Sequence, residues 1–316
     1  MKAAVITAFG QAPRYADCAE PVPQHAGQML VDVLAVGLHH ITRGRASGQH
    51  YSSGAGGTAL PFVAGVDGVG RGPDGTLRYF VQGPGQPGTL AEKTVIDRAR
   101  SIELPQNADP VIMAAAMNPA MAAWLALRCR IKFEAGQKVL ILGATGSSGT
   151  MAVQIARHLG AGQIVAAGRD TQKLAMLGAL GATHAVQLDD PHLGALAAQV
   201  DVVLDFVWGE RAAPTMEALL KQRADRSAPL TWIHVGSMAG DAATLPGAFL
   251  RAANLTVMGS GMGSVPDRAI LAELPALARE IAHGTFQIGA QAVPLGEVAR
   301  AWSAAAGAHE RIVITP

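Results

Sequence analysis

The sequence has few cysteines, few aromatic residues and almost no charge imbalance. Cys18 and Cys129 are its only cysteines, far apart and without a partner pattern, which argues against a disulfide framework and a cysteine zinc site. The formal net charge is +1 with no basic run, so nothing favours a nucleic-acid or anionic-membrane partner. No window approaches about 18 uninterrupted apolar residues, and residues 1–6 are too short an apolar run for a signal peptide. We therefore expect a cytoplasmic protein without a membrane partner.

Small and aliphatic residues are abundant instead. Hydrophobic residues make up 49% of the 316 positions and aromatic ones only 4%, a mixture that suits closely packed strands and helices. This length predicts two domains. Residues 1–110 are dense in Gly and Pro, with short apolar runs at 29–36, 62–66 and 90–96 between turn signals. That pattern predicts an irregular β-domain.

The pattern changes from about residue 111 to strands alternating with Ala-rich helices. The predicted strands are 139–142, 164–167, 201–206, 230–235 and 255–258, and the predicted helices are 148–159, 172–180, 213–222 and 268–283. Such alternation predicts an α/β fold with a doubly wound parallel sheet. The last strand, 311–314, has no helix after it, and we expect this tail to rejoin the first domain. The predicted domains are thus 1–110, completed by 266–316, and 111–265.

A glycine-spaced turn, Gly143-Ala144-Thr145-Gly146-Ser147-Ser148-Gly149, lies between the first strand and first helix of this alternation. Gly146 would let the backbone approach a pyrophosphate, and Gly149 would allow close packing of the helix on the sheet. The helix N-terminus would supply free N–H groups and the positive end of a dipole. A tight turn that binds nothing is the alternative, but the strand–turn–helix context favours a dinucleotide site. Its predicted binding residues are Ala144, Thr145, Gly146, Ser147, Ser148 and Gly149.

The choice of nicotinamide cofactor depends on the end of the second strand, Gly168-Arg169, where an NAD site usually offers a carboxylate to the ribose. Arg169 can pair bidentately with a 2′-phosphate, and Lys173 adds a second cation one helical turn later. The sequence therefore favours NADPH over NADH. Asp170 would reverse this preference if the strand ended one residue later; otherwise it caps the helix of residues 171–180.

Two further segments follow predicted strands at their carboxyl ends, where open α/β sheets bind ligands. They are Phe206-Val207-Trp208-Gly209 and His234-Val235-Gly236-Ser237. We predict cofactor contacts at Phe206, Val207, Val235, Gly236 and Ser237.

Several motifs occur in the order seen in one known family and together span nearly the whole chain. They are Met1–Val5, Val36–His40, Pro61–Gly68, Gly88–Glu92, Gly143–Gly149, Leu180–Ala182 and Arg311–Ile314. The chain thereby resembles the zinc-free quinone oxidoreductase branch of the medium-chain dehydrogenase/reductase superfamily. This resemblance implies a GroES-like β-domain built from both chain ends, a Rossmann domain, and an active site in the cleft between them. It also implies that Gly261 and Gly263 approach the nicotinamide, and that the strand 255–258 pairs two copies into a homodimer.

The departures from the superfamily concern its metal and its substrate pocket. Zinc alcohol dehydrogenases carry a Cys near 37–43 and a Gly-His-Glu motif near 65–67, where this chain has Gly37–Thr42 without Cys and Gly65-Val66-Asp67. We therefore expect no metal, although His39, His40 and His50 could ligate one by residue type. Quinone reductases usually read Gly-Val-Asn-Pro-x-Asp, so His39, His40 and Thr42 replace Asn, Pro and Asp. Without a metal, Asp67 is expected to form a structural hydrogen bond.

The chemistry that remains is direct hydride transfer, in which the cofactor supplies reactivity and the protein supplies orientation. Quinones and α,β-unsaturated carbonyls need one polar group near the carbonyl oxygen and a proton source, which can be water. The candidates are His39, Thr42 and Tyr51, each of which could equally be a solvated or structural side chain. The sequence predicts an NADPH-dependent reductase of quinones or related electrophilic carbonyl compounds. The alternatives are an enone or 2-alkenal double-bond reductase and a non-catalytic NADPH-binding sensor.

Overall fold

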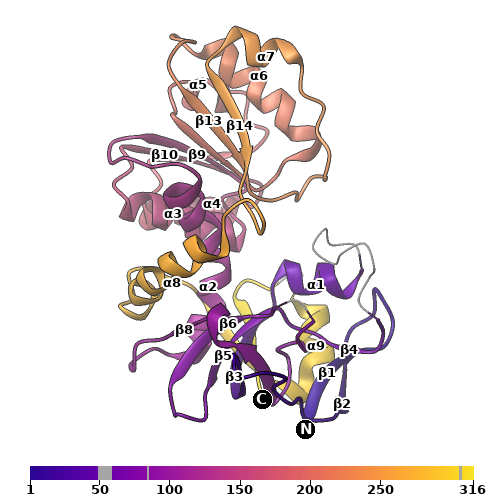
Figure 1. The fold of residues 1–316 in the computed structure, drawn as a ribbon. Coiled ribbons are helices and arrows are strands. Elements are labelled where there is room, and N and C mark those ends of the chain that lie inside the picture. The colour runs from indigo at the N-terminus through magenta and orange to yellow at the C-terminus, as the bar shows by residue number, and fades with distance from the viewer. Residues whose placement is uncertain (49–58, 84, 306–307) are drawn as a thin grey trace. The chain divides into compact units, whose positions relative to one another are not determined.

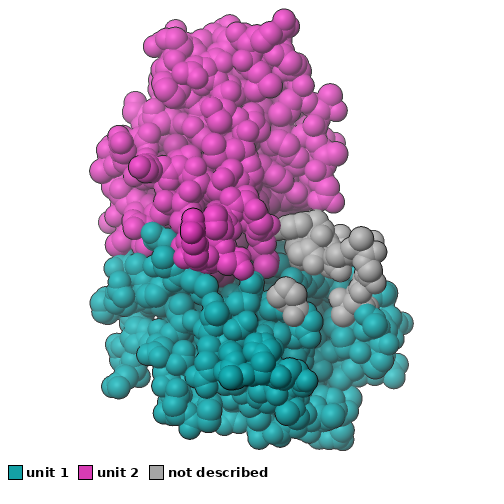
Figure 2. Space-filling model, in the orientation of Figure 1, with its two compact units in different colours: residues 1–118, 271–316 teal, residues 119–270 magenta. Residues whose placement is uncertain are grey.

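The structure is a computed structural model that describes residues 1–48, 59–83, 85–305 and 308–316 (Figure 1). The chain forms two compact units, Met1–Asn118 with Leu271–Pro316, and Pro119–Ile270 (Figure 2). The first unit is therefore built from both ends of the chain. The domain limits drawn from the sequence stay a prediction.

The second unit is built on a six-stranded parallel sheet with the order β11-β10-β9-β12-β13-β14. The first strand lies in the middle, and the strand order reverses between β9 and β12. This is the doubly wound order that creates a ligand crevice at the reversal point. The strands are β9 (Lys138–Leu142), β10 (Gln163–Gly168), β11 (His184–Gln187), β12 (Val202–Asp205), β13 (Leu230–His234) and β14 (Leu255–Gly259).

Helices on the faces of this sheet explain why its strands are continuous apolar runs rather than alternating ones. One face buries Leu140 and Leu142 with Leu193 and Met216 in a single apolar cluster. Helix α3, which starts within the glycine-spaced segment, also packs on β9 and β10. The helices of this unit are α3 (Ser147–His158), α4 (Thr171–Leu180), α5 (Leu193–Leu196), α6 (Ala212–Gln222) and α7 (Gly247–Ala252).

The first unit is mainly antiparallel. Its three-stranded sheet has the order β2-β1-β4, and its seven-stranded sheet has the order β15-β16-β3-β5-β6-β8 with β7 also on β3. The strands are β1 (Lys2–Ile6), β2 (Arg14–Asp17), β3 (Gln28–Gly37), β4 (Phe62–Val63), β5 (Asp67–Arg71), β6 (Leu77–Val81), β7 (Lys93–Asp97), β8 (Ser101–Glu103), β15 (Ala290–Pro294) and β16 (Arg311–Thr315). The helices α1 (His40–Ala46) and α9 (Val298–Ala304) belong to the same unit.

Two long helices, α2 (Pro110–Leu125) and α8 (Asp267–Ala282), contain the boundaries between the units. The stretch Pro110–Arg130 is long and apolar enough to cross a membrane by length and composition. Because 61% of its apolar window is buried inside the protein, the same composition fits a core helix.

Most of the predicted elements are confirmed, and the α/β class with a parallel sheet and a β-rich unit is correct. The final strand does rejoin the first unit, since β16 pairs with β3 through Val313 and Gly37. The predicted strand 62–66 ends early, at Val63, because Gly65 adopts a φ of +105°. A side chain there would lie 2.3 Å from Oγ1 of Thr89. Several elements have no counterpart among the sequence-based predictions, including α1, α2, α5, α7, α9, β11 and β15.

Arg223, the residue after α6, ties together the chain segments that lead into β12 and β13. Its side chain is 5% exposed. It donates to the carbonyl oxygens of Ala198, Val200, Ala228 and Pro229 at distances of 2.8 to 3.3 Å. One buried guanidinium therefore satisfies four loop carbonyls that no strand pairs.

We predict that Arg223→Leu lowers the free energy of unfolding by about 2 to 4 kcal/mol, because the four carbonyls lose charge-assisted partners inside the protein. Urea-induced unfolding followed by circular dichroism measures this change. The control is Arg226→Leu. Arg226 lies three residues further along the chain and is exposed, so this variant should change the free energy of unfolding by less than about 0.5 kcal/mol. Equal shifts in the two variants would contradict the role of Arg223.

Candidate functional site

The glycine turn lies where the strand order of the parallel sheet reverses. Gly143 follows β9 with a φ of +84°, a conformation that favours glycine. A Cβ atom there would lie 3.2 Å from Cγ2 of Val207, which follows β12. The segments after β9 and β12 therefore meet at the crevice where doubly wound sheets bind their ligands.

Gly149 and Gly146 differ in what surrounds them. A Cβ atom on Gly149 would lie 2.2 Å from the carbonyl oxygen of Gly143 and 2.6 Å from Cα of Ala144, so only glycine lets α3 start this close to β9. A Cβ atom on Gly146 would meet only the Gly143 oxygen, at 3.5 Å. Packing within the protein therefore does not require glycine at 146, whereas close approach of a ligand to the backbone would.

The N-terminus of α3 has the features of an anion site. Gly146 is its N-cap and supplies no side-chain cap, and no acidic residue lies in the first turn. The first N–H groups of this 12-residue helix therefore have no capping side chain, and they carry the positive end of the dipole. Thr150 turns inward, where its Oγ1 donates to the carbonyl of Ala144 at 3.1 Å. A pyrophosphate fits this helix start.

The end of β10 carries two cations beside the glycine turn. A Cβ atom on Gly168 would lie 2.5 Å from Cγ2 of Thr145, so the strand end and the turn are in direct contact. Arg169 is exposed and Lys173 half-buried, and neither side chain has a hydrogen-bond or ion-pair partner among the described residues. Asp170 is the N-cap of α4 and accepts a hydrogen bond from the Lys173 backbone N–H at 3.0 Å. The capping role predicted for Asp170 is confirmed.

Asp205, which was not predicted from the sequence, accepts hydrogen bonds from residues beside the crevice. It is fully buried at the end of β12. Its Oδ1 accepts from the N–H groups of Val207 and Trp208 at 2.8 and 2.9 Å, and its Oδ2 accepts from Nε1 of Trp232 at 3.0 Å. Burial raises the pKa of Asp205, and these three donors oppose that rise. The one available signal was a carboxylate closing the apolar run 202–204.

Trp208, held by Asp205, has a φ of +52°, the one positive φ outside glycine among the described residues. Its ring lies against His234 with centroids 4.4 Å apart. The predicted segment 206–207 adjoins 235–237, because Val235 and Gly236 donate to the Asp205 carbonyl at 2.7 and 3.1 Å.

The loop after β14 joins the same edge of the sheet. Ser260 donates its N–H to the carbonyl of His234 at 2.8 Å. Arg130, a second residue missed from sequence, donates from Nε to the Gly259 carbonyl at 2.8 Å and from Nη1 to the Ser264 carbonyl at 3.1 Å. Arg130 thus fastens both ends of the loop that contains Gly261 and Gly263.

A buried polar cluster in the first unit contains the candidate His39 and is formed by His39, Asp67, Tyr79 and Arg311. His39 and Asp67 are 2% and 1% exposed. Nε2 of His39 lies 3.1 Å from Oδ1 of Asp67, in contact but outside hydrogen-bond geometry. Tyr79 donates from its hydroxyl to Oδ2 of Asp67 at 2.7 Å, which confirms the structural hydrogen bond expected of Asp67.

Arg311 completes this cluster from β16, with Nη2 against Nδ1 of His39. A guanidinium only donates, so Nδ1 of His39 is an acceptor and the ring proton lies on Nε2, facing Asp67. Burial lowers the pKa of Arg311, and Asp67 opposes this. Nδ1 of His39 is therefore bonded to Arg311, while Nε2 lies against Asp67 without a hydrogen bond.

The other candidates in this unit have different surroundings. Thr42, in α1, is 2% exposed, and its hydroxyl has no partner in the described part of the chain. Tyr51 and His50 lie outside the described residues. No group of three potential metal ligands occurs among those that are described. With Arg311 against His39, the donors present here do not fit a zinc ion.

The chain is similar to several known proteins. A family described as zinc-binding dehydrogenase matches residues 149–281. The chain is 29% identical to the probable NADPH-dependent quinone reductase tdiC of Emericella nidulans, over the full length of both proteins. It is 26% identical to the quinone oxidoreductase of Thermus thermophilus, solved also in complex with NADPH, with a TM-score of 0.79 and full coverage of both chains. An Arabidopsis thaliana NADPH-dependent alkenal/one oxidoreductase is 28% identical over 57% of this chain and 50% of its own length.

The two-unit α/β fold with its doubly wound parallel sheet is similar to that of solved quinone oxidoreductases. The similarity to these quinone reductases extends over the full length of the chain.

We predict that Gly149→Ala weakens dinucleotide binding at least tenfold, because the added methyl group forces α3 away from the turn. Fluorescence titration with a nicotinamide dinucleotide measures this. The control is Gly178→Ala in α4, where a Cβ atom meets nothing within 4 Å. That variant should leave binding unchanged and stabilise its helix by about 0.5 to 1 kcal/mol. Unchanged binding by Gly149→Ala would show that the turn tolerates a side chain.

We predict that Tyr79→Phe lowers the free energy of unfolding by about 1 to 3 kcal/mol, because buried Asp67 loses a donor. Exposed Tyr15→Phe is the control.

Burial, then the charge of Asp67 and its hydrogen bond, raises the pKa of Tyr79 well above 10.0. The unfolded chain therefore loses the Tyr79 proton first, and the stability due to this residue is lost as the pH rises above about 10. Unfolding measured from pH 8 to 11 should show a shallower loss in Tyr79→Phe than in the parent.

Proposed function

We propose that this chain is an NADPH-dependent reductase that transfers a hydride to quinones or related electrophilic carbonyl compounds. The single observation that carries the cofactor preference is the pair of unpartnered cations, Arg169 and Lys173, at the end of β10 beside the glycine turn. The names of the relatives matched over their full length support the reaction class.

The second unit would hold the cofactor along the carboxyl edge of its sheet. The α3 N-terminus binds the pyrophosphate, Gly146 lets it approach, and Arg169 with Lys173 binds the 2′-phosphate. Ala144 is fully buried and its N–H donates to the Ala167 carbonyl at 2.9 Å, so it shapes the turn. The remaining contacts come from Thr145, Ser147, Ser148, Gly149, Gly168, Phe206, Val207, Val235, Gly236, Ser237, Gly261 and Gly263.

The first unit would orient the substrate. When bound, NADPH supplies the hydride, so the chain itself needs only to position the acceptor and stabilise its oxygen. Within this proposal Thr42 donates to the substrate oxygen, because its hydroxyl is unpartnered among the described residues. His39 positions the start of α1 through Asp67 and Arg311, Tyr51 is a second donor candidate, and water supplies the proton. No step passes through a metal.

The alkenal/one oxidoreductase similarity supports a second candidate, reduction of an enone or 2-alkenal double bond. The two activities share the cofactor and differ in the shape of the substrate pocket. The replacements at residues 39–42 support a third, a non-catalytic NADPH-binding sensor. NADPH oxidation with matched panels separates them: turnover on benzoquinones supports the first, turnover only on enones the second, and tight binding without turnover the third.

The proposal includes a cytoplasmic homodimer that pairs through β14. This strand is the last of the six-stranded sheet, so its outer edge has no partner strand in the described chain. Analytical ultracentrifugation reports the mass directly.

We predict that Arg169→Ala weakens NADPH binding roughly 10- to 100-fold and changes NADH binding less than about twofold, because only NADPH carries the 2′-phosphate. Nicotinamide fluorescence titration measures both dissociation constants. Arg251→Ala, an exposed arginine of α7 in the same unit, is the matched control and should alter neither.

Oxidation of the bound NADPH on addition of a quinone would then establish the reaction. An equal loss of affinity for both cofactors in Arg169→Ala would remove the basis for NADPH preference. Failure of the parent protein to bind either nucleotide would end the reductase proposal.

A further inference from the structure

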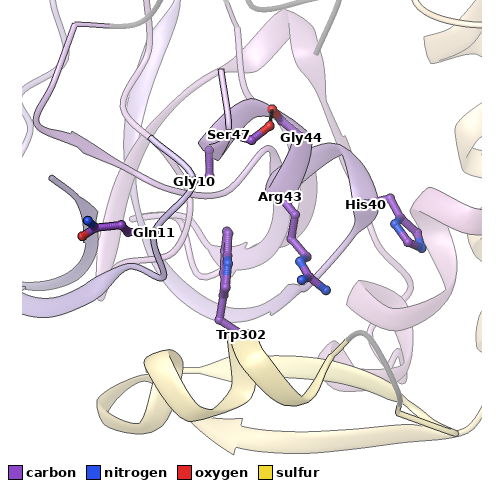
Figure 3. A pocket seen from close by; sticks show the side chains of 8 residues that line it. Gly10, Gln11, His40, Arg43, Gly44, Ser47 and Trp302 are labelled. Atoms are coloured by element: carbon purple, nitrogen blue, oxygen red, sulfur yellow. Dashed lines mark hydrogen bonds between the residues drawn. The ribbon is translucent and has the colours of Figure 1, made fainter. Parts of the chain in front are cut away.

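A cavity of about 360 Å³ lies in the first unit, and all of its described lining residues belong to that unit. Its lining comes from three places: the connection between β1 and β2, helix α1 with Ser47, and helix α9. In Figure 3, Trp302 rises from α9, and Arg43 reaches from α1 into the space beside it. The described lining residues are Gly10, Gln11, His40, Arg43, Gly44, Ala46, Ser47 and Trp302.

The described lining of this cavity carries a positive charge, on Arg43, and no negative charge. Arg43 is half-buried and has no ion pair among the described residues. No Asp or Glu occurs among the described lining residues, so nothing there neutralises the guanidinium. The chain as a whole carries a formal net charge of only +1, which makes an unbalanced cation inside a cavity a local feature rather than a consequence of composition.

The positive surroundings of the cavity also affect the pKa of the neighbouring His40. Burial lowers its pKa, and the nearby side chains of Arg311, Arg43 and His39 lower it further. At neutral pH His40 is therefore uncharged, and its ring can donate or accept a hydrogen bond. Gln11, from the connection between β1 and β2, also lines the cavity.

The wall and the volume set the kind of molecule that fits. Trp302 is 7% exposed, so its ring is fixed by the core, and it offers an aromatic surface to the cavity at little cost in side-chain entropy. The volume falls in the range of about 300 to 1,000 Å³ typical of small-molecule sites. Gly44, on the same helix as Arg43, contributes no side chain. The cavity therefore has room for one or two rings beside a cation.

We propose that this cavity binds a small organic anion with a flat aromatic ring, whose carboxylate pairs with Arg43 while its ring packs against Trp302. The carboxylate accepts two parallel hydrogen bonds from the guanidinium, and Gln11 or His40 donates to an oxygen at the ring edge. The site lies within one unit and does not depend on NADPH or on the proposed reduction.

The test uses two ring compounds that differ only in charge, 1-naphthoate and 1-naphthamide, titrated calorimetrically into the full-length protein without nucleotide. We expect 1-naphthoate to bind at least tenfold more tightly than 1-naphthamide. Arg43→Gln should reduce 1-naphthoate affinity on the order of tenfold and leave 1-naphthamide unchanged. Arg43→Lys should give an intermediate loss of affinity for 1-naphthoate, since lysine keeps the positive charge but lacks the two parallel N–H donors of the guanidinium.

Arg300→Gln is the matched control, because Arg300 lies on α9 near Trp302 in sequence but outside the lining, with its charge paired to Glu297. Melting temperatures and NADPH titrations of all variants show whether each has folded and whether the cofactor site is intact. Equal affinity for the two naphthyl compounds, unchanged 1-naphthoate binding in Arg43→Gln, or no binding of either compound at millimolar concentration would overturn the proposal. Inorganic phosphate binding as tightly as 1-naphthoate would equally overturn it, because the ring would then contribute nothing.

Discussion

The contact between the start of α3 and the turn after β9 is the constraint on which the dinucleotide crevice depends. No room exists for a Cβ atom between Gly149 and the carbonyl of Gly143, and none exists between Gly168 and Thr145. Three segments of backbone can therefore converge where side chains would hold them apart. The helix start that results has N–H groups without a capping side chain, so one steric requirement produces both the packing and an uncapped helix N-terminus.

Buried carboxylates organise each unit in a similar way. Asp205 gathers donors from its own turn and from Trp232 on the neighbouring strand, while Asp67 gathers Tyr79 and lies against His39. A carboxylate suits this purpose because its two oxygens accept several hydrogen bonds at once, in directions that separate segments can reach. Each cluster costs desolvation, visible in the raised pKa of Asp205, and that cost is offset only when the donors are correctly placed. Such clusters therefore specify geometry more than they add stability.

The sequence predicted what local pattern determines and missed what depends on distant partners. Apolar runs and the glycine spacing gave the parallel sheet and the phosphate turn, because both follow from neighbouring residues. The N-cap that Asp170 forms on α4 could be predicted from the sequence for the same reason. Arg130 and Arg223 could not, since their acceptors are carbonyls in segments that only the fold brings near. The surroundings of His39 were equally hidden, because Arg311 is 272 residues away along the chain.

Unpartnered cations connect the cofactor preference with the second cavity. Several basic side chains bond to a carbonyl or a carboxylate, as Arg223, Arg130 and Arg78 do. Where a cation lacks such a partner beside a shaped concavity, the surrounding protein has already met part of the desolvation cost that binding an anion requires. Arg43, half-buried beside Trp302, meets this condition, whereas Arg169 beside the glycine turn lacks a partner but is exposed. Since the chain is nearly neutral overall, these positions distinguish its anion sites where net charge does not.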